Sequence, residues 1–246
     1  TKAGTGTWTL SASSNTYTGT TTVSGGTLKL NNLSTTSSAT FDLASGATLK
    51  LDGGPVSIPT LTGSGYLSGG TVASTVTLGG GGGTQSFSGL IRDGIEGGKL
   101  SVVKTGSGAL TLSAANTYTG STTINAGTLI VTGSLSDSTV VTLSTSGAVY
   151  QVDVNDTIAG LAGVSGTTVS TSTAGLKTLV VNQSGNSTFD GVIANGSGSL
   201  ALLKTGSGTL TLSGANTYTG ATTISGGTLS VSSLANGGAS SGIGAS

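Results

Sequence analysis

The residues whose types could support chemistry are few, and they fall into two short clusters. Asp153-Val154-Asn155-Asp156 gathers oxygen atoms of the kind that Ca²⁺ prefers, but it lacks the Gly-Gly-x-Gly-x-Asp repeat of calcium-binding β-rolls and a bidentate Glu. Arg92-Asp93-Gly94-Ile95-Glu96-Gly97 holds the only Arg and the only Glu of the chain, whereas polysaccharide cleavage needs several acids and a base in one groove. We therefore expect a solvated turn at the first cluster and a loop leaving the coil at the second.

Two further features are typical of binding sites, and each has a simpler structural interpretation. The five glycines from Gly79 to Gly83 are not followed by the Lys-Ser/Thr of a phosphate-binding loop, so they predict a flexible bulge or a close approach to a neighbouring chain. Lys104 and Lys204 open the two strongest repeats, where we expect a surface or capping role.

Two sets of residues could line a repetitive binding surface. The alternating Thr16, Thr18, Thr20 and Thr22 resemble an ice-binding array, which needs matching Thr in adjacent coils, but the motif returns only every 100 residues. Tyrosines in the same motif could stack on sugars, although we expect them to pack at corners: Tyr17, Tyr118 and Tyr218.

The composition excludes most classes of enzyme and of nucleic-acid-binding protein. Of 246 residues, 46 are Thr, 39 are Ser and 45 are Gly, and charged residues are only 7%, with eight acids and eight bases. The absence of His and Cys excludes zinc fingers, disulfide frameworks and Cys/His catalysis, and the balanced charge gives no attraction to DNA, RNA or anionic lipid. We predict that the chain is not an enzyme, has no catalytic residue, and binds no metal, cofactor or nucleic acid.

The elements that must position these residues are short strands. Apolar residues alternate with polar ones in Leu110-Thr111-Leu112, Thr128-Leu129-Ile130-Val131 and Leu210-Thr211-Leu212, which is typical of half-buried strands, and no window carries a helical stripe. No apolar run approaches the ~18 residues of a membrane span, so we predict an all-β chain that does not insert into a membrane.

A unit of about 100 residues recurs along the chain. Residues 104–129 and 204–229 are identical at 21 of 26 positions, and residues 2–28 form a third copy with one extra residue. We expect a single β-helical segment over 1–246, with internal units of about 1–101, 102–201 and 202–246, the last one partial.

Short strands favour a solenoid over a string of immunoglobulin-like sandwiches, which need longer strands and large core residues. The sequence predicts a right-handed parallel β-helix with three short strands per coil, roughly 20–25 residues a coil and a rod of about 50 Å. Asn116 to Gly120 should form a corner of the coil, and Thr111 and Thr211 should point outward. One continuous core should bury ten residues: Leu110, Leu112, Ile124, Leu129, Val131, Leu210, Leu212, Ile224, Leu229 and Val231.

The repeated motif also carries a resemblance to a known family. Residues 106–131, GSGALTLSAANTYTGSTTINAGTLIV, and their two partners resemble the autotransporter-associated β-strand repeat, also called the passenger-associated transport repeat. The resemblance implies a right-handed β-helical stalk outside the outer membrane of a Gram-negative bacterium, in passengers that act in adhesion or aggregation. The segment shows neither a signal peptide nor a membrane β-barrel, so its route to the surface stays open.

Three functional classes remain from the sequence. The first is the structural shaft of an extracellular, surface-displayed repeat protein in adhesion, aggregation or matrix formation, in contact with a host or matrix surface. The others are a self-assembling fibre subunit and a polysaccharide-binding or polysaccharide-cleaving β-helix. The ends show no cap, since the chain runs out at Gly242-Ile243-Gly244-Ala245-Ser246 without charges or Pro, so we expect each end to continue into neighbouring repeats or to contact another copy.

Overall fold

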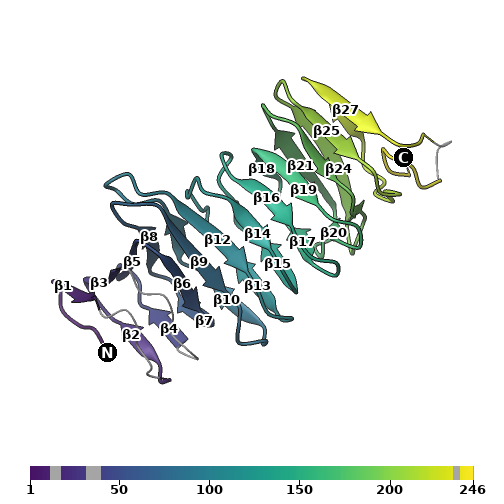
Figure 1. The fold of residues 1–246 in the computed structure, drawn as a ribbon. Helices are drawn as coiled ribbons and strands as arrows, with labels where there is room; N and C mark the ends of the chain where they lie inside the picture. The colour runs from purple at the N-terminus through teal and green to yellow at the C-terminus, as the bar shows by residue number, and fades with distance from the viewer. Residues whose placement is uncertain (12–17, 32–39, 235–238, 246) are drawn as a thin grey trace. The chain divides into compact units, whose positions relative to one another are not determined.

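The computed structural model describes residues 1–11, 18–31, 40–234 and 239–245. The chain divides into two compact units, Thr1–Thr122 and Thr123–Ser246, which we call unit 1 and unit 2 and describe separately. Every regular element of the described residues is a β-strand (Figure 1). None of these residues forms a helix that could cross a membrane.

Unit 1 has three faces, each formed by short strands from successive turns. The first face is the sheet β1 (Thr7–Leu10), β3 (Thr27–Asn31), β5 (Thr48–Asp52), β8 (Tyr66–Gly69) and β11 (Leu90–Arg92). The second contains β2 (Thr21–Val23), β4 (Thr40–Leu43) and β7 (Thr60–Gly63), followed by the pair β10 (Gln85–Phe87) and β13 (Ala109–Leu112). The third contains β6 (Pro55–Ile58), β9 (Ser74–Leu78) and β12 (Leu100–Lys104).

Unit 2 also has three faces, and β14 (Thr122–Ile124) spans the boundary before it. Its first face is β15 (Thr128–Val131), β17 (Val149–Val152), β20 (Thr168–Ser170) and β23 (Val192–Ile193). Its second is β16 (Val140–Leu143), β19 (Gly160–Gly163), β22 (Ser187–Phe189), β25 (Thr209–Leu212) and β27 (Thr228–Val231). Its third is β18 (Asp156–Ile158), β21 (Leu176–Asn182), β24 (Ser199–Thr205) and β26 (Thr222–Ile224).

Strand pairing within the units is parallel and in register from one turn to the next. Some paired strands are three apart in the chain, as β5 and β8 or β18 and β21 are, and a turn between them contributes one strand to each face. Other paired strands are two apart, as β3 and β5 or β15 and β17 are. Thr48 pairs with Tyr66, 18 residues later, and Leu100 pairs with Ser74, 26 residues earlier. These pairings confirm an all-β, parallel β-solenoid with three short strands per coil, and they exclude sandwiches, whose sheets are antiparallel.

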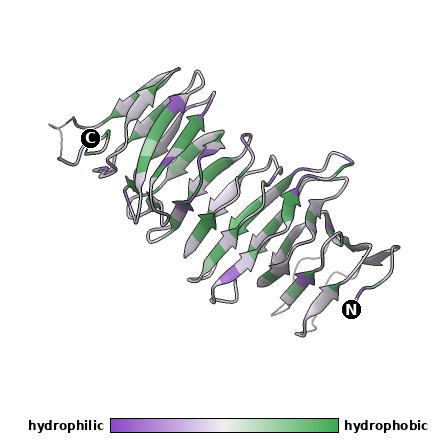
Figure 2. Ribbon diagram, turned by 180° about the vertical axis from the view of Figure 1, so that it is seen from behind, coloured by the Kyte–Doolittle hydropathy of each residue, from purple (hydrophilic) through white to green (hydrophobic). Residues whose placement is uncertain are grey.

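The interior of each unit is filled by apolar side chains that lie at matching positions of successive strands. In unit 1, Leu28, Leu49, Leu67 and Ile91 pair in sequence across β3, β5, β8 and β11, and all four are buried. Hydrophobic residues accordingly recur along the strands in Figure 2, with few hydrophilic ones between them. Threonine fills many of the alternate, outward positions, and Thr111 and Thr211 lie half-buried between neighbouring turns.

Seven of the ten predicted core residues are buried, but three in the last turn of unit 2 are not. Ile224 is 54% exposed, and Leu229 and Val231 are only half-buried. The alternation of β26 and β27 still turns these side chains inward. They lack cover because β26 and β27 are the last strands of their sheets, so no described turn lies over them.

The predicted corner from Asn116 to Gly120 is instead an irregular third side of a turn. Thr117 N–H donates to Ile91 O of β11 at 2.9 Å, and Thr217 N–H donates to Ile193 O of β23 at 2.9 Å. The segment therefore lies against a strand of the preceding turn, although it forms no strand itself.

The end of the described chain partly covers the last turn, contrary to the prediction of an uncapped end. Ser241 makes an antiparallel bridge with Asn216, and Ala245 N–H donates to Tyr218 O at 2.9 Å. The short Gly-rich segment can fold back in this way because Gly244 adopts a left-handed backbone, with a φ of 89°.

Candidate functional site

The lysine that opens each repeat is buried, not exposed. In β12, Leu100, Val102 and Lys104 are alternate, inward-facing residues, and the Lys104 side chain has no exposed surface. Its ammonium donates to Thr105 O at 2.6 Å and Gly106 O at 2.9 Å. Lys104 thus caps backbone carbonyls from within the coil, so the surface part of our prediction is wrong and the capping part is confirmed.

Lys204 and Lys2 repeat this arrangement. Lys204 Nζ donates to Thr205 O at 2.5 Å, Gly206 O at 3.1 Å and Gly226 O at 3.4 Å. Lys2 Nζ donates to Ala3 O, Gly4 O and Gly25 O at 2.9–3.0 Å. The ammonium of Lys2 or Lys204 therefore bonds carbonyls of two successive turns, and burial lowers the pKa of Lys104 and of Lys204.

The Asn of the motif links neighbouring turns. Asn116 Oδ1 accepts Ile91 N–H at 3.0 Å, and Asn216 Oδ1 accepts Ile193 N–H at 2.8 Å. Both side chains are buried. The segments that contain these Asn residues form no regular strand beside β11 or β23. The Asn side-chain oxygens therefore accept the N–H groups of Ile91 and Ile193 that the carbonyls of a neighbouring strand would otherwise accept.

The Tyr of the motif packs inside the coil. Tyr118 and Tyr218 have no exposed surface, and each hydroxyl lies 2.6 Å from the hydroxyl oxygen of the Thr four residues later, Thr122 or Thr222. At these two positions the rings therefore pack inside the coil, as part of a side and not of a corner, and they do not form a sugar-stacking row. Tyr17 and Thr16 lie outside the described residues, so they stay predictions.

The oxygen-rich cluster at 153–156 sends its side chains to different partners. Asp153 accepts Ser172 N–H at 2.6 Å and the Ser172 and Thr171 hydroxyls at 2.6 and 3.0 Å, and Asn155 Oδ1 accepts Thr178 N–H at 2.9 Å. These bonds hold the pKa of Asp153 below its usual value against the effect of burial. No set of three or more acidic side chains in the described part of the chain could hold a metal ion.

Asp156 is the most perturbed acid of the cluster. It is buried beneath Tyr150, whose hydroxyl donates to Oδ2 at 3.0 Å, and Leu135 N–H donates to both carboxylate oxygens at 3.2 and 3.3 Å. Burial raises the pKa of Asp156 to about 6, and nearby Asp137 adds to the increase. The carboxyl ties the 133–139 loop to the coil.

The charged cluster at 92–97 forms a loop, as expected. Asp93 Oδ1 accepts the backbone N–H of Leu100 at 2.8 Å and of Thr119 at 3.0 Å, while Glu96 pairs with Lys50 at 2.6 Å. The Arg92 guanidinium lies over the Tyr66 ring, 4.4 Å from its centroid. Each acid therefore has a structural partner, and the two do not converge on one point.

The glycine run approaches the next turn of the same unit. A Cβ at Gly106 would lie 2.1 Å from Gly79 O, and Gly79 has a φ of 88°. The close approach that we predicted is therefore present, but to the same chain instead of a neighbouring one.

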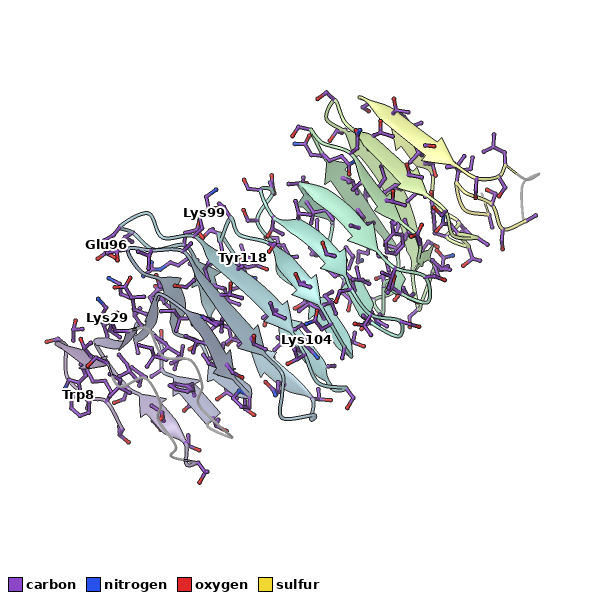
Figure 3. The ribbon with its side chains drawn as sticks, viewed as in Figure 1. Trp8, Lys29, Glu96, Lys99, Lys104 and Tyr118 are labelled. Carbon is purple, nitrogen blue, oxygen red and sulfur yellow. The ribbon has the colours of Figure 1, made fainter. Side chains whose placement is uncertain are left out.

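Sequence reasoning missed one outward row of basic residues in unit 1. Lys29 pairs in register with Lys50, and Figure 3 shows Lys29 and Glu96 on one edge of the unit, away from Lys104. The signal was present in the sequence: Thr27-Leu28-Lys29-Leu30 recurs as Thr48-Leu49-Lys50-Leu51, one coil later.

Comparison with known families confirms the repeat. The family described as passenger-associated-transport-repeat matches residues 1–30, 102–131 and 202–231. These segments contain the buried lysines, and the second and third contain the Asn and Tyr described above. Comparison with curated proteins and with solved structures gives no match.

Proposed function

We propose that this β-solenoid is a shaft segment of a secreted or surface-displayed passenger protein and that its role is structural. The observation that carries the proposal is the use of the repeat's polar residues. Lys104, Asn116 and Tyr118 all point inward and bond neighbouring backbone or side chains of the coil. The polar groups of these three residues are engaged inside the coil, which supports rigidity and does not leave them facing solvent for a ligand.

The passenger family supports the extracellular assignment. We expect the repeat to act during or just after export, because Lys204 and Asn116 join successive turns and so favour ordered stacking from one turn to the next. The test is surface display of the full-length protein carrying Asn116→Ala and Asn216→Ala. Reduced display on intact cells at normal total expression supports the proposal, and normal display of a correctly folded variant contradicts it.

The structure offers little support for catalysis, and we propose that the chain is not an enzyme. Asp93, Asp153 and Asp156 are each bonded to backbone N–H groups, and no pair of them flanks a common groove. Incubation with pectin, alginate or a glycosaminoglycan should release neither reducing ends nor unsaturated products. Turnover that disappears in Glu96→Gln or Asp153→Asn would refute this proposal.

We also propose contact with a further turn or a second copy at the last turn of unit 2. Ile224 is 54% exposed and Leu234 71% exposed, and β26 and β27 present an unpaired edge among the described strands. Light scattering should show association that grows with concentration and weakens in Ile224→Lys, whereas Val140→Lys, at an exposed apolar residue of another turn, should change it little. A strictly monomeric segment would count against this contact.

A further inference from the structure

The outward row of basic residues in unit 1 spans four neighbouring strands. Lys29 of β3 pairs with Lys50 of β5, Lys50 with Ser68 of β8, and Ser68 with Arg92 of β11. Three of the chain's eight basic residues therefore stand in one line, at a strand spacing of about 4.8 Å. Because the chain has so few charges, this line is a local concentration of positive charge.

A row of hydroxyls runs beside the basic row. Thr7, Thr27 and Thr48 pair in register two residues before it, and the row ends at Tyr66. Both rows line a groove of about 260 Å³, closed on one side by Ile95 and Glu96 from the loop after β11. The groove thus presents hydroxyl donors and acceptors on one side and cations on the other.

The three cations differ in how firmly they are held. Lys29 pairs at 2.5 Å with the buried Asp52, whose pKa lies well below its usual value because Lys29 and Thr71 hydrogen-bond to it. Lys50 pairs with Glu96, which is 42% exposed on its loop. An exposed pair of this kind contributes little to stability, so an incoming anion can replace the Glu96 carboxylate.

Arg92 is the cation with unused bonding capacity. Its guanidinium is oriented by the Tyr66 ring. Its Nε is buried without a hydrogen-bond partner and lies out of reach of a ligand, so a carboxylate would be bound by the two terminal amino groups. Among the described residues it has no ion pair with a carboxylate. A planar guanidinium held in place by a ring is suited to bidentate recognition of a carboxylate.

We propose that this groove binds an acidic polysaccharide, with a uronate carboxylate on Arg92 and Lys50 and the sugar hydroxyls on Thr27 and Thr48. An extended polymer fits because the rows cross the strands and repeat from turn to turn. Nucleic acid is disfavoured because Asp52 and Glu96 offset two of the three cations, which leaves too little charge for a phosphate backbone. This inference adds a ligand to the proposed shaft and does not depend on its export.

Binding should occur without cleavage. Glu96 lines the groove and is paired with Lys50, and Asp52 is paired with Lys29 beside it. Two acids that are each held by a different lysine do not form the acid-and-base pair that cleavage of a glycosidic bond needs. The groove therefore retains the polymer and leaves its glycosidic bonds intact.

Titration calorimetry with a hexamer of galacturonate tests the proposal, with maltohexaose as the neutral oligosaccharide and monomeric galacturonate as the single anion. We expect the acidic hexamer to bind, and the other two probes to bind at least about tenfold more weakly. Arg92→Gln and Lys50→Gln should each weaken binding of the acidic hexamer about tenfold or more. Glu96→Gln should strengthen it severalfold, because it removes the competing carboxylate.

Matched variants separate a site from general electrostatics. Lys99→Gln removes an exposed cation of the same unit, and Asp190→Asn removes an exposed acid elsewhere, so both should leave the affinity unchanged. Circular dichroism establishes that each variant is folded. The proposal is overturned if maltohexaose or the monomer binds as tightly as the acidic hexamer, if the hexamer does not bind, or if Lys99→Gln weakens binding as much as folded Arg92→Gln.

Discussion

A buried ammonium is costly for a protein interior unless hydrogen bonds replace its water. In each repeat, carbonyls of the tight turn after the lysine supply these bonds, and the turn is possible because a glycine follows at a left-handed φ, as at Gly106 (69°) and Gly206 (71°). The lysine and the glycine therefore act together: the glycine allows the turn that presents the carbonyls, and the ammonium satisfies these carbonyls.

Replacing Lys104 by Met should destabilise unit 1 by about 2 kcal/mol, because the part-buried carbonyls of Thr105 and Gly106 lose a charged donor. Lys99→Met is the matched control, since Lys99 is exposed, and it should change the free energy of unfolding by less than about 0.5 kcal/mol. Urea unfolding of both variants measures the difference. Equal free energies of unfolding of the two variants would show that the hydrogen bonds of the Lys104 ammonium contribute nothing to stability.

Asp156 makes the stability of unit 2 depend on pH in an unusual direction. Its pKa is raised from 3.8 to about 6 by burial, so the folded state holds a proton that the unfolded state has lost between these values. The resulting stabilisation is complete below about pH 4 and is lost as the pH rises through about 6, a change of about 3 kcal/mol.

Asp156→Asn should remove this pH dependence, because an amide does not titrate. Free energies of unfolding at pH 4 and pH 7 should therefore fall more steeply for the natural protein than for the variant. Asp52 and Asp153, whose pKa values are lowered, act in the opposite sense but equally in both proteins. Parallel curves would contradict the assignment to Asp156.

At the scale of the strand and turn, close packing of backbones sets the strictest requirement. A Cβ at Gly106 would lie 2.1 Å from Gly79 O in the preceding turn, whereas a Cβ at Gly46 would meet nothing within 4 Å, although both glycines have a positive φ. A comparison of substitutions at Gly106 and Gly46 therefore distinguishes the strain of a left-handed residue from the cost of pushing two turns apart.

Gly46→Ala should cost about 1 kcal/mol, the price of a left-handed backbone alone. Gly106→Ala should cost at least about 2 kcal/mol more, because the added methyl group overlaps backbone that cannot rotate away. Thermal unfolding of the two single variants measures this. Equal losses would mean that the two turns separate without strain.

The strands were predictable from the sequence, but the partners of the polar residues were not. Leu110-Thr111-Leu112 alternates as a half-buried strand must, so its inward residues follow from the pattern alone. The sequence predicts a surface or capping role for Lys104, because lysine is rarely buried unless it is paired, and its carbonyl partners come together only in the folded coil. The groove could not be predicted for the same reason. Lys50 and Arg92 are 42 residues apart in the chain, and only the strand register of the folded coil brings them into one row.

At the largest scale, the turns of each unit stack in parallel and in register. The same stacking explains the inward rows of Leu, the inter-turn bonds of Lys204 and Asn116, and the outward row of Lys29 and Lys50. It also explains why, of the predicted core residues in the last turn, Ile224 is exposed and Leu229 and Val231 are only half-buried, because a solenoid turn is covered only by its neighbours.

Disulfide formation between introduced cysteines tests this stacking most directly, since the chain has no cysteine of its own. Ser86 pairs with Thr111 in unit 1, and Thr188 pairs with Thr211 in unit 2, at equivalent outward positions. Both cysteine pairs should oxidise readily, whereas a Ser86/Ser113 pair, displaced by two residues, should not, because its Cα atoms lie too far apart for a bridge. Failure of both in-register pairs, or equally fast oxidation of the displaced pair, would contradict the parallel solenoid.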